Sequence, residues 1–383
     1  MDFGLNPDQE SLQTYARDFL DKECPPAFVR KVMESDDGFD AGFYKHMADL
    51  GWMGIAIPEE HGGQGMSYVD LAVLLEEMGR ALVPGPFFAS VCLGAVAVQE
   101  AGTDAQRKAV LPAIASGERR ATVAYTEASG RVDAGGITMQ ARREGDAWVL
   151  DGKKSFVPDA HLADHIVVAA RTKTGDGDPT QGVTLFLVDR ETSGVSVDQL
   201  KTMDTTRRWC EVTFDGVKIG ADSVLGEADA GWPVLERALQ RSTALLCAES
   251  VGGSHKVLDM SVEYAKVRVQ FGRPIGSFQA VKHKCAEMLV DVEMARSAMY
   301  YAAWAASSSD EELPLAASVA KAYCGDAYTR VASAGIQVHG GIGFTWEHDM
   351  HLYFKRAKAN EMLLGDPTYH REQVARLVAD EAV

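Results

Sequence analysis

Two segments in the C-terminal third of the chain carry residues suited to hold a dinucleotide. In residues 268–279, Arg268 can offer a planar fork of charged donors to a pyrophosphate. In residues 337–344, the pair Gly340-Gly341 lets backbone amides approach phosphate oxygens with no Cβ in the way. Three glutamines can donate and accept hydrogen bonds toward a ribose and an adenine: Gln270, Gln279 and Gln337.

Each of these residues also has an ordinary structural interpretation. Gly340 and Gly341 could form a plain loop, and Arg268 could make a surface ion pair. Phe156 could cover the face of a bound aromatic ring, or it could pack in a hydrophobic core. Taken one at a time, the residues leave both interpretations open.

The bulk composition excludes several classes of partner. The 383 residues are enough for two or three domains with a large core. A net charge of −17 repels nucleic acid and anionic membrane surfaces. No apolar run reaches the ~20 residues that a membrane span needs. We therefore expect no nucleic-acid partner and no membrane partner.

The N-terminus and the cysteines bear on the compartment. The first residues show no basic region followed by an apolar region, so they do not resemble a secretion signal, and we expect a cytoplasmic protein. We expect reduced, buried thiols and no metal site, because the cysteines are far apart and form no C-x-x-C pair. They are Cys24, Cys92, Cys210, Cys247, Cys285 and Cys324.

The pattern of apolar residues divides the chain into three regions. Residues 1–117 show helical spacing, beginning at the cap formed by Asn6 and Pro7. Residues 118–228 change to short β-type runs separated by turns, which predicts a small antiparallel barrel or sandwich. Residues 229–383 are helical again, with long apolar stripes typical of an antiparallel bundle. The sequence predicts a mainly α protein with a central β domain.

The expected elements can be given by range. Strands are expected at 121–126, 137–142, 147–150, 166–170, 183–188, 195–197 and 212–214. C-terminal helices are expected at 231–265, 277–308, 315–336, 348–363 and 369–381. In the second of these helices one apolar stripe is expected to face the core: Val281, Cys285, Met288, Val292 and Ala295.

Four motifs at matching separations make the chain similar to the acyl-CoA dehydrogenase family. Two of them are Leu50-Gly51-Trp52 with Ile57 through Gly63, and Thr126-Glu127 with Gly152-x-Lys154 and Phe156. The other two are Arg268 through Ile275 with Phe278-Gln279, and Gln337 through Phe344 followed by Glu347. The resemblance covers essentially the whole chain. It implies an N-terminal helical domain, a central β domain and a C-terminal four-helix bundle.

The resemblance also implies an activity, a cofactor and partners. Members of the family bind FAD and oxidise acyl-CoA thioesters to trans-2-enoyl-CoA. A carboxylate removes the α-proton, the β-hydrogen leaves as hydride to flavin N5, and an electron-transfer flavoprotein reoxidises the FAD. The expected pathways are fatty-acid or sterol side-chain β-oxidation. A bulky or branched acyl group is favoured because Ser242, Thr243 and Leu364 leave the pocket less charged.

The chain departs from the family at the base. The common catalytic glutamate precedes a glycine near the C-terminal end, and this chain has Leu364 there. Some members carry the base on the first helix of the C-terminal bundle, at a position that falls on Ser242. Glu249 is a substitute candidate, although it lies ~10 Å further along that helix. Its ordinary role would be an interhelical salt bridge or a contact with a nearby arginine.

Further departures fall on one half of the flavin site. In the family each FAD lies at a dimer interface, where one subunit cradles the ring and its neighbour donates further contacts. The cradling half is altered: Val132 replaces a serine, Pro158 a hydroxyl residue, Asp366 a threonine and Leu364 the glutamate. Separately, Thr243 takes the place of an arginine that some members carry. The donated half is intact: Arg268, Gln270, Phe271, Phe278, Gln279, Gln337, Gly340 and Gly341. Thr126 and Phe156 complete the expected cofactor contacts.

This division favours a subunit without the catalytic glutamate. It would complete the FAD site of a homologous acyl-CoA dehydrogenase subunit in a heterotetramer. One alternative is a self-sufficient homotetramer with a displaced base such as Glu249. The other is a different flavin chemistry on this fold, such as that of a monooxygenase or oxidase, which needs no α-proton base.

Overall fold

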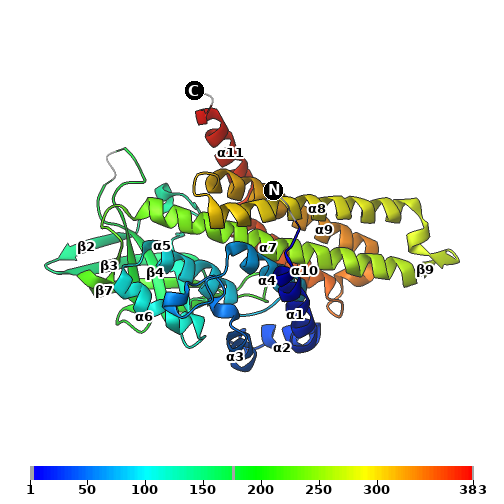
Figure 1. Ribbon diagram of the computed structural model, residues 1–383, viewed down its shortest axis with the longest axis horizontal. Helices are drawn as coiled ribbons and strands as arrows, with labels where there is room; N and C mark the ends of the chain where they lie inside the picture. The colour runs from blue at the N-terminus through cyan, green and yellow to red at the C-terminus, as the bar shows by residue number, and fades with distance from the viewer. Residues whose placement is uncertain (1–3, 175–176, 382–383) are drawn as a thin grey trace. The chain divides into compact units, whose positions relative to one another are not determined.

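The computed structural model describes residues 4–174 and 177–381, and Figure 1 labels the elements along the chain. The chain separates into two compact units. The bundle unit comprises residues 1–31, 68–83 and 243–383, and the sheet unit comprises residues 32–67 and 84–242. Helix α7 (Gly231–Val267) begins in the sheet unit and continues into the bundle unit.

The sheet unit is built around one sheet, which has eight strands within the described residues. They are β1 (Ala121–Ala124), β2 (Gln140–Glu144), β3 (Ala147–Pro158), β4 (His165–Arg171), β5 (Val183–Asp189), β6 (Val195–Leu200), β7 (Trp209–Gly220) and β8 (Val224–Leu225). They lie in the order β6-β7-β3-β2-β4-β5-β8, with β1 paired to β4. The seven strands expected from the sequence are confirmed, and β8 was not expected.

Two strand pairings are parallel, and here the antiparallel expectation is wrong. β1 runs parallel to β4, with Ala121 opposite His165, and β2 pairs in parallel with the end of β4. The hairpin of β2 and β3 separates β1 from β4 in the chain, so β4 can return in the direction of β1. The other ladders of this sheet are antiparallel.

The core of the sheet unit lies against β4 and its neighbours. Val168 on one face of β4 packs in a cluster with Trp148 and Phe186, whose rings meet edge to face at 5.5 Å. Val167 and Ala169 on the other face are buried as well. Because both faces are covered, β4 reads as a continuous apolar run without polar alternation.

Helices complete the sheet unit. They are α3 (Ala41–Asp49), α5 (Val96–Ala101), α6 (Asp104–Ala115), the π-helix η3 (Phe88–Ala95) and the short turns η1 (Trp52–Gly54), η2 (Glu59–His61), η4 (Ala134–Gly136) and η5 (Ala221–Ser223). The buried helix η3 lies directly on β1, because a Cβ at Gly94 would come within 2.5 Å of the Cβ of Ala121.

The bundle unit consists of long helices and one hairpin. Its elements are α1 (Pro7–Glu23), most of α2 (Pro26–Met33), α4 (Tyr68–Ala81), β9 (Val269–Gln270), β10 (Arg273–Pro274), η6 (Ile275–Ser277), α8 (Gln279–Ser308), α9 (Leu313–His339), η7 (Gly340–Phe344), α10 (Met350–Met362) and α11 (Pro367–Glu381). Helix α9 packs against α8, α10 and α11. The five C-terminal helices expected from the sequence are confirmed. None of the described helices is long and apolar enough to cross a membrane.

Helices α4 and α7 approach each other closely at two glycines. A Cβ on Gly252 would lie 1.8 Å from the backbone oxygen of Glu76, and a Cβ on Gly79 would lie 2.0 Å from that of Glu249. No other residue type fits at either position without moving a helix.

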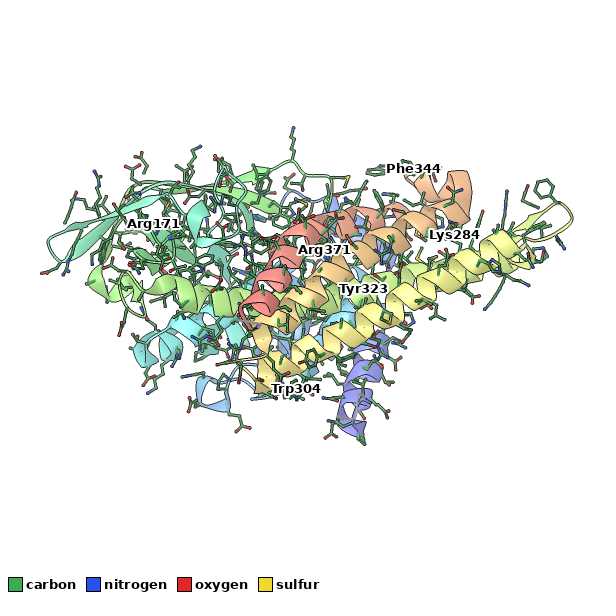
Figure 2. The ribbon with its side chains drawn as sticks, turned by 90° about the horizontal axis from the view of Figure 1, so that it is seen from above. Arg171, Lys284, Trp304, Tyr323, Phe344 and Arg371 are labelled. Carbon is green, nitrogen blue, oxygen red and sulfur yellow. The ribbon has the colours of Figure 1, made fainter. Side chains whose placement is uncertain are left out.

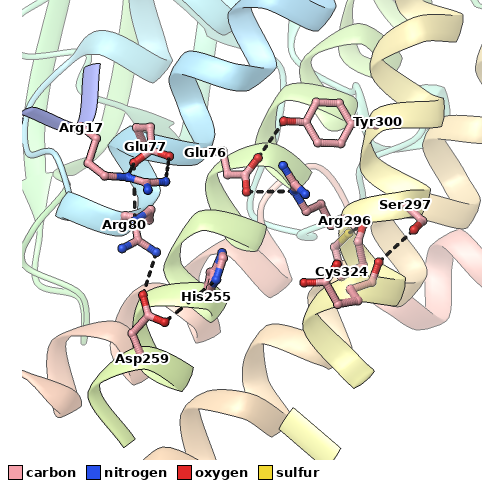
Figure 3. Close-up of polar contacts among 12 residues, drawn as sticks. Arg17, Glu76, Glu77, Arg80, His255, Asp259, Arg296, Ser297, Tyr300 and Cys324 are labelled. Carbon is pink, nitrogen blue, oxygen red and sulfur yellow. Dashed lines mark hydrogen bonds and ion pairs between the residues drawn. The ribbon is translucent and has the colours of Figure 1, made fainter. Parts of the chain in front are cut away.

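Buried carboxylates of α4 fix its neighbours in the bundle unit, as Figure 3 shows. Glu76 accepts hydrogen bonds from Arg296 Nε at 3.2 Å and from Tyr300 Oη at 2.8 Å. Glu77 accepts two from Arg17, at 2.6 and 2.9 Å. These pairs join α4 to α8 and to α1. Because both carboxylates are hydrogen-bonded, they can be buried in an otherwise apolar face of α4.

Candidate functional site

The β9–β10 hairpin joins α7 to α8 and carries the first dinucleotide motif. Its turn residues, Phe271 and Gly272, both have positive φ, at 51° and 77°. A turn of this kind favours Asn-Gly, and a phenylalanine in the left-handed region is strained. Phe271 is 92% exposed and makes only an edge contact with Phe278 at 6.1 Å among described rings. This geometry suits a side chain whose main contacts lie outside the chain.

Arg268 lies at the base of the hairpin. Its backbone N–H donates to the carbonyl of Tyr264 at 2.9 Å, and its carbonyl accepts from Ile275 at 2.8 Å. The side chain is exposed, and it makes no ion pair with any carboxylate of the described chain. The surface ion pair considered for Arg268 is therefore not formed, and its guanidinium is available to an anion from outside.

The second motif follows the end of α9. Gly340 caps this helix with φ 65°, and its N–H already donates to the carbonyls of Ile336 and Gln337. Both Gly340 and Gly341 are exposed, and a Cβ on either would meet nothing within 4 Å. Close approach of an external phosphate is thus sterically open here.

A stacked ring pair, of which His339 is buried and Tyr264 half-buried, connects the two motifs. His339 stacks on Tyr264 with 4.5 Å between ring centroids, and its Nδ1 lies 2.8 Å from the carbonyl oxygen of Gly335. Burial lowers the pKa of His339 below its ordinary value and so favours the neutral ring. Since Tyr264 precedes Arg268 by one helical turn, the stack holds Arg268 and Gly340 at the same end of the bundle unit. The stacking role of His339 is not evident from the sequence, although the residue lies within the second motif.

The expected donated residues thus gather at one end of the bundle unit. Phe344, which Figure 2 labels, lies at the same end and is 73% exposed. The guanidinium of Arg273 covers the ring of Phe278 at 4.2 Å. Apart from half-buried Phe278, all the donated residues are exposed: Arg268, Gln270, Phe271, Gln279, Gln337, Gly340 and Gly341.

In the sheet unit, Thr126 and Phe156 lie on neighbouring backbone segments, because Ser155 N–H donates to the carbonyl of Thr126 at 2.9 Å. Phe156 has φ 55° in a stretch where the register of β3 against β7 shifts. Such a bulge redirects a side chain. Phe156 is 52% exposed, so the core-packing interpretation is wrong.

A buried ion pair supports this region. Lys154 Nζ lies 2.7 Å from Oε1 of Glu127, which also accepts from the N–H groups of Thr138 and Met139 at 2.9 Å. Burial lowers the pKa of Lys154 to about 8, although Glu127 opposes this shift. Burial would raise the pKa of Glu127, but the charge of Lys154 and the hydrogen bonds from Lys154, Thr138 and Met139 together outweigh burial, and the pKa is lowered. The pair stabilises the start of the loop after Thr126.

Three altered residues have structural roles of their own. Pro158 ends β3, and its carbonyl accepts from Thr122 Oγ1 at 2.7 Å. Asp366 caps α11, because its Oδ1 accepts from Tyr369 N–H at 2.7 Å. Ser242 Oγ is buried within hydrogen-bond distance of two carbonyls, those of Cys92 at 2.5 Å and Ala238 at 2.8 Å.

Leu364 occupies a tightly held turn between α10 and α11. It is buried, with φ 62°, and its carbonyl lies 2.9 Å from Nε2 of His370. Lys321 is wholly buried, and its Nζ donates to the carbonyls of Asn360, Glu361 and Gly365 at 2.8–3.0 Å. The turn at which the resemblance places the family's base is thus well fixed, and its residue, Leu364, has no group that can take a proton. Lys321 and His370 were not identified from the sequence.

Glu249 is committed to a buried contact. Its Oε1 accepts from Arg356 Nη1 at 2.8 Å and from Asn360 Nδ2 at 3.1 Å. Arg241, the arginine near Thr243, pairs in the sheet unit with Glu100 at 2.9 Å. Neither side chain is a free acid or base.

Together the residues can bind an anionic dinucleotide at the exposed end of the bundle unit. Of the three candidate base positions, Leu364 has no ionisable group, Ser242 Oγ lies between two carbonyls and Glu249 is paired with Arg356. Five of the cysteines are free and buried, and Cys285 is half-buried. Within the described residues no group of histidine, cysteine and carboxylate side chains is arranged to hold a metal ion.

Comparison with known proteins identifies the family. Models of the N-terminal, middle and C-terminal domains of acyl-CoA dehydrogenase match residues 6–118, 122–217 and 229–379. Acyl-CoA dehydrogenase IpdE2 of Mycolicibacterium smegmatis is 34% identical over 378 residues, which cover 98% of this chain and 99% of that protein.

Two solved structures are similar over nearly their whole length. A variant of the Tcur3481-Tcur3483 steroid ACAD is 32% identical with a TM-score of 0.87, and 98% of each chain is covered. A chain of the ChsE4-ChsE5 complex from Mycobacterium tuberculosis is 29% identical with a TM-score of 0.89, and 99% of each chain is covered. The chain belongs to the acyl-CoA dehydrogenase family of flavoenzyme oxidoreductases, and it has the fold of that family.

Proposed function

We propose that this chain is the non-catalytic subunit of a heteromeric acyl-CoA dehydrogenase. It completes the FAD site of a homologous subunit, which supplies the base. One observation carries the proposal: the donated residues are exposed and open at one end of the bundle unit, while the family's base position holds Leu364.

The residues at the exposed end of the bundle unit suit the part of FAD that receives its contacts from the neighbouring subunit. Arg268 is exposed without an ion-pair partner among the described carboxylates, in a protein of net charge −17. Such a guanidinium binds a pyrophosphate with two parallel hydrogen bonds. Gly341 leaves room for phosphate oxygens, and Phe271 offers an exposed ring held in a strained turn.

The residues of the chain's own half of the site fit FAD poorly. Pro158 offers no N–H, so it cannot donate to a flavin nitrogen. Asp366 brings a carboxylate where the family has a threonine, although its Oδ1 is used in capping α11. Val132 has no hydroxyl to donate to a phosphate.

When bound, FAD supplies the oxidation of an acyl-CoA to a trans-2-enoyl-CoA. This chain contributes Arg268, the three glutamines and the glycine pair, which hold and orient the dinucleotide. The partner subunit contributes the carboxylate that removes the α-proton. An electron-transfer flavoprotein is the proposed acceptor, and the proposed assembly is an α2β2 heterotetramer.

We infer the kind of acyl group from the uncharged residues that stand at three of the altered positions. Ser242, Thr243 and Leu364 favour a bulky or branched acyl chain, including a sterol side chain. The similarity to the steroid ACAD supports this choice.

The proposal is tested by purifying the chain alone and with a homologous subunit encoded in the same host. Alone, the protein should hold little FAD; together, the complex should hold FAD and reduce it with an acyl-CoA. A yellow, fully active homotetramer would support the displaced-base alternative instead, and oxygen consumption would support a monooxygenase or oxidase.

A further inference from the structure

The buried ring of His339 is in contact with two other rings. Tyr264, near the end of α7, stacks on it with 4.5 Å between the ring centroids and 24° between the ring planes. His348, in the segment between η7 and α10, lies at 4.7 Å and 58°. A Cβ on Gly343 would lie only 2.9 Å from the Cβ of His339, so η7 packs on the same side chain. One side chain of α9 thus contacts three other segments of the bundle unit.

Two of these contacts lead directly to donated residues. The backbone N–H of Arg268 donates to the carbonyl of Tyr264 at 2.9 Å, so the base of the β9–β10 hairpin follows the position of Tyr264. Gly340 is the next residue after His339 and caps α9. A shift of His339 relative to Tyr264 would therefore change the spacing between Arg268 and Gly340.

Hydrogen bonds fix the orientation of both histidine rings. Nδ1 of His339 must carry a proton, because it lies 2.8 Å from the carbonyl oxygen of Gly335, which can only accept. Nδ1 of His348 accepts from the N–H of Met350 at 3.1 Å. Burial, with a smaller contribution from His348, lowers the pKa of His339 and favours its neutral form. The stack is therefore a contact of neutral, oriented rings, which suits a fixed geometry.

The donated residues have few contacts of their own that could set this spacing. A Cβ on Gly340 or Gly341 would meet nothing within 4 Å, and the side chain of Arg268 is exposed. One dinucleotide has to meet the guanidinium and the glycine amides together. A spacing that is set before the ligand arrives lowers the cost of ordering these groups on binding.

We propose that His339 is a positioning residue for the dinucleotide: its ring, stacked on Tyr264, holds Arg268 and the glycine pair at the spacing that one dinucleotide requires. His339 acts through Arg268 and Gly340, and it need not touch the ligand. This inference rests on the proposed function, in which the dinucleotide is the FAD that this chain helps a homologous subunit to bind.

Variants of His339 separate the ring from its hydrogen bond. Flavin fluorescence measures the dissociation constant of FAD from the flavin-depleted complex with the homologous subunit. His339→Leu keeps a buried apolar side chain without the stack, and it should weaken FAD binding about 10-fold. His339→Asn keeps a donor toward Gly335 but no ring, and it should bind as weakly. His339→Phe restores a flat ring and should return the affinity to within about 3-fold of wild type.

A second variant and a control guard against effects on folding. Tyr264→Leu removes the stack at a half-buried position, and it should weaken FAD binding as His339→Leu does. Trp304→Leu removes a different stack of the bundle unit, that of Trp304 on Tyr301 at 5.8 Å, and it should leave the affinity unchanged. Figure 2 shows Trp304 well away from Phe344, which lies at the donated end. Thermal unfolding should be alike in His339→Leu and His339→Phe.

A double-mutant cycle tests whether the ring acts through Arg268. Arg268→Ala should cost several-fold less FAD affinity in the His339→Leu background than in wild type, because the guanidinium is already displaced there. Losses that multiply in full would overturn the proposal, and so would a His339→Phe variant as weak as His339→Leu. If Arg268→Ala weakens FAD binding and neither His339→Leu nor Tyr264→Leu does, only the positioning role is wrong. If Arg268→Ala has no effect in the wild-type background, the proposed function fails and the positioning role fails with it.

Discussion

The guanidinium of Arg356 lies 2.8 Å from the carboxylate of Glu249, and both side chains are buried in the bundle unit. Asn360 donates to the same oxygen at 3.1 Å. A carboxylate held in this way gains stability from its charge and would lose it on accepting a proton. The contact therefore argues that Glu249 stabilises the packing of α7 against α10 and does not act as a base.

The variant Glu249→Gln separates the two roles. A structural role predicts a loss of roughly 3 kcal/mol in the free energy of unfolding, because Arg356 is left buried without its counter-charge. The rate of flavin reduction in the assembled complex should stay unchanged. The control E249Q/R356M should recover part of the stability. If Glu249 were the base, flavin reduction would instead slow by roughly 10²- to 10⁴-fold.

Arg268→Ala tests the donated half of the site. The complex with the partner subunit should lose FAD affinity by about 10- to 100-fold, since a hydrogen bond to a charged group contributes ~1.5–3 kcal/mol. Arg268→Lys keeps the charge but not the planar fork, so its affinity should fall between the two. Lys266→Ala is the control, because this nearby exposed lysine pairs with Glu263, and its FAD affinity should equal that of wild type. Equal FAD content in wild type and Arg268→Ala would remove Arg268 from the site.

His370 makes the turn around Leu364 sensitive to acid. Burial, helped by the charge of Lys321, lowers the pKa of His370 to about 4 from an ordinary value of 6.5. The unfolded chain therefore binds more protons between these values, and the free energy of unfolding should fall as the pH drops from about 6.5 to about 4. The loss from this residue is roughly 3 kcal/mol at most.

The matching variant is His370→Gln, which keeps a donor toward the carbonyl of Leu364. Thermal unfolding measured from pH 7.5 to pH 4 should show a shallower acid dependence than in wild type. The exposed His283→Gln serves as control and should leave the wild-type dependence intact. Identical profiles for wild type and His370→Gln would contradict the assignment.

Leu364→Glu tests whether a missing base alone explains the lack of turnover that we propose. The turn is fixed by Lys321 and His370, so a glutamate can be placed there, but Pro158 and Val132 remain. Because Pro158 has no N–H and Val132 no hydroxyl to donate to FAD, we expect little restored dehydrogenation by the variant alone. Acyl-CoA-dependent flavin reduction near that of the partnered complex would show that only the base was lost.

The sequence predicted the long elements well because their apolar periodicity is local. The helix expected at 231–265 is α7, and the cap at Asn6 forms a full capping box with Gln9. For β3 the sequence predicted only the first third of the strand, because Gly152 and Lys154 interrupt the apolar pattern. The buried Lys154 is tolerated in the strand because its charge is paired with that of Glu127, 27 residues earlier in the chain. A tertiary pairing of this kind leaves no signal in the local sequence.

In the candidate site, too, the tertiary contacts could not be predicted from the local sequence. The two dinucleotide motifs were visible as residue types, whereas the contacts that hold them were not. The stack of His339 on Tyr264 joins residues from the ends of two helices. Lys321, whose three acceptors come from 39 to 44 residues further on, reads in the sequence as an ordinary surface lysine.

The most direct test of the central claim is anaerobic flavin bleaching of the wild-type chain, purified without a partner and supplied with excess FAD. With octanoyl-CoA as substrate we predict no bleaching, because neither Leu364 nor Ser242 can accept the α-proton and Glu249 is held by Arg356. Adding the homologous subunit should produce bleaching that depends on Arg268 and Gln337 of this chain. Stoichiometric bleaching by the chain alone would contradict the non-catalytic assignment.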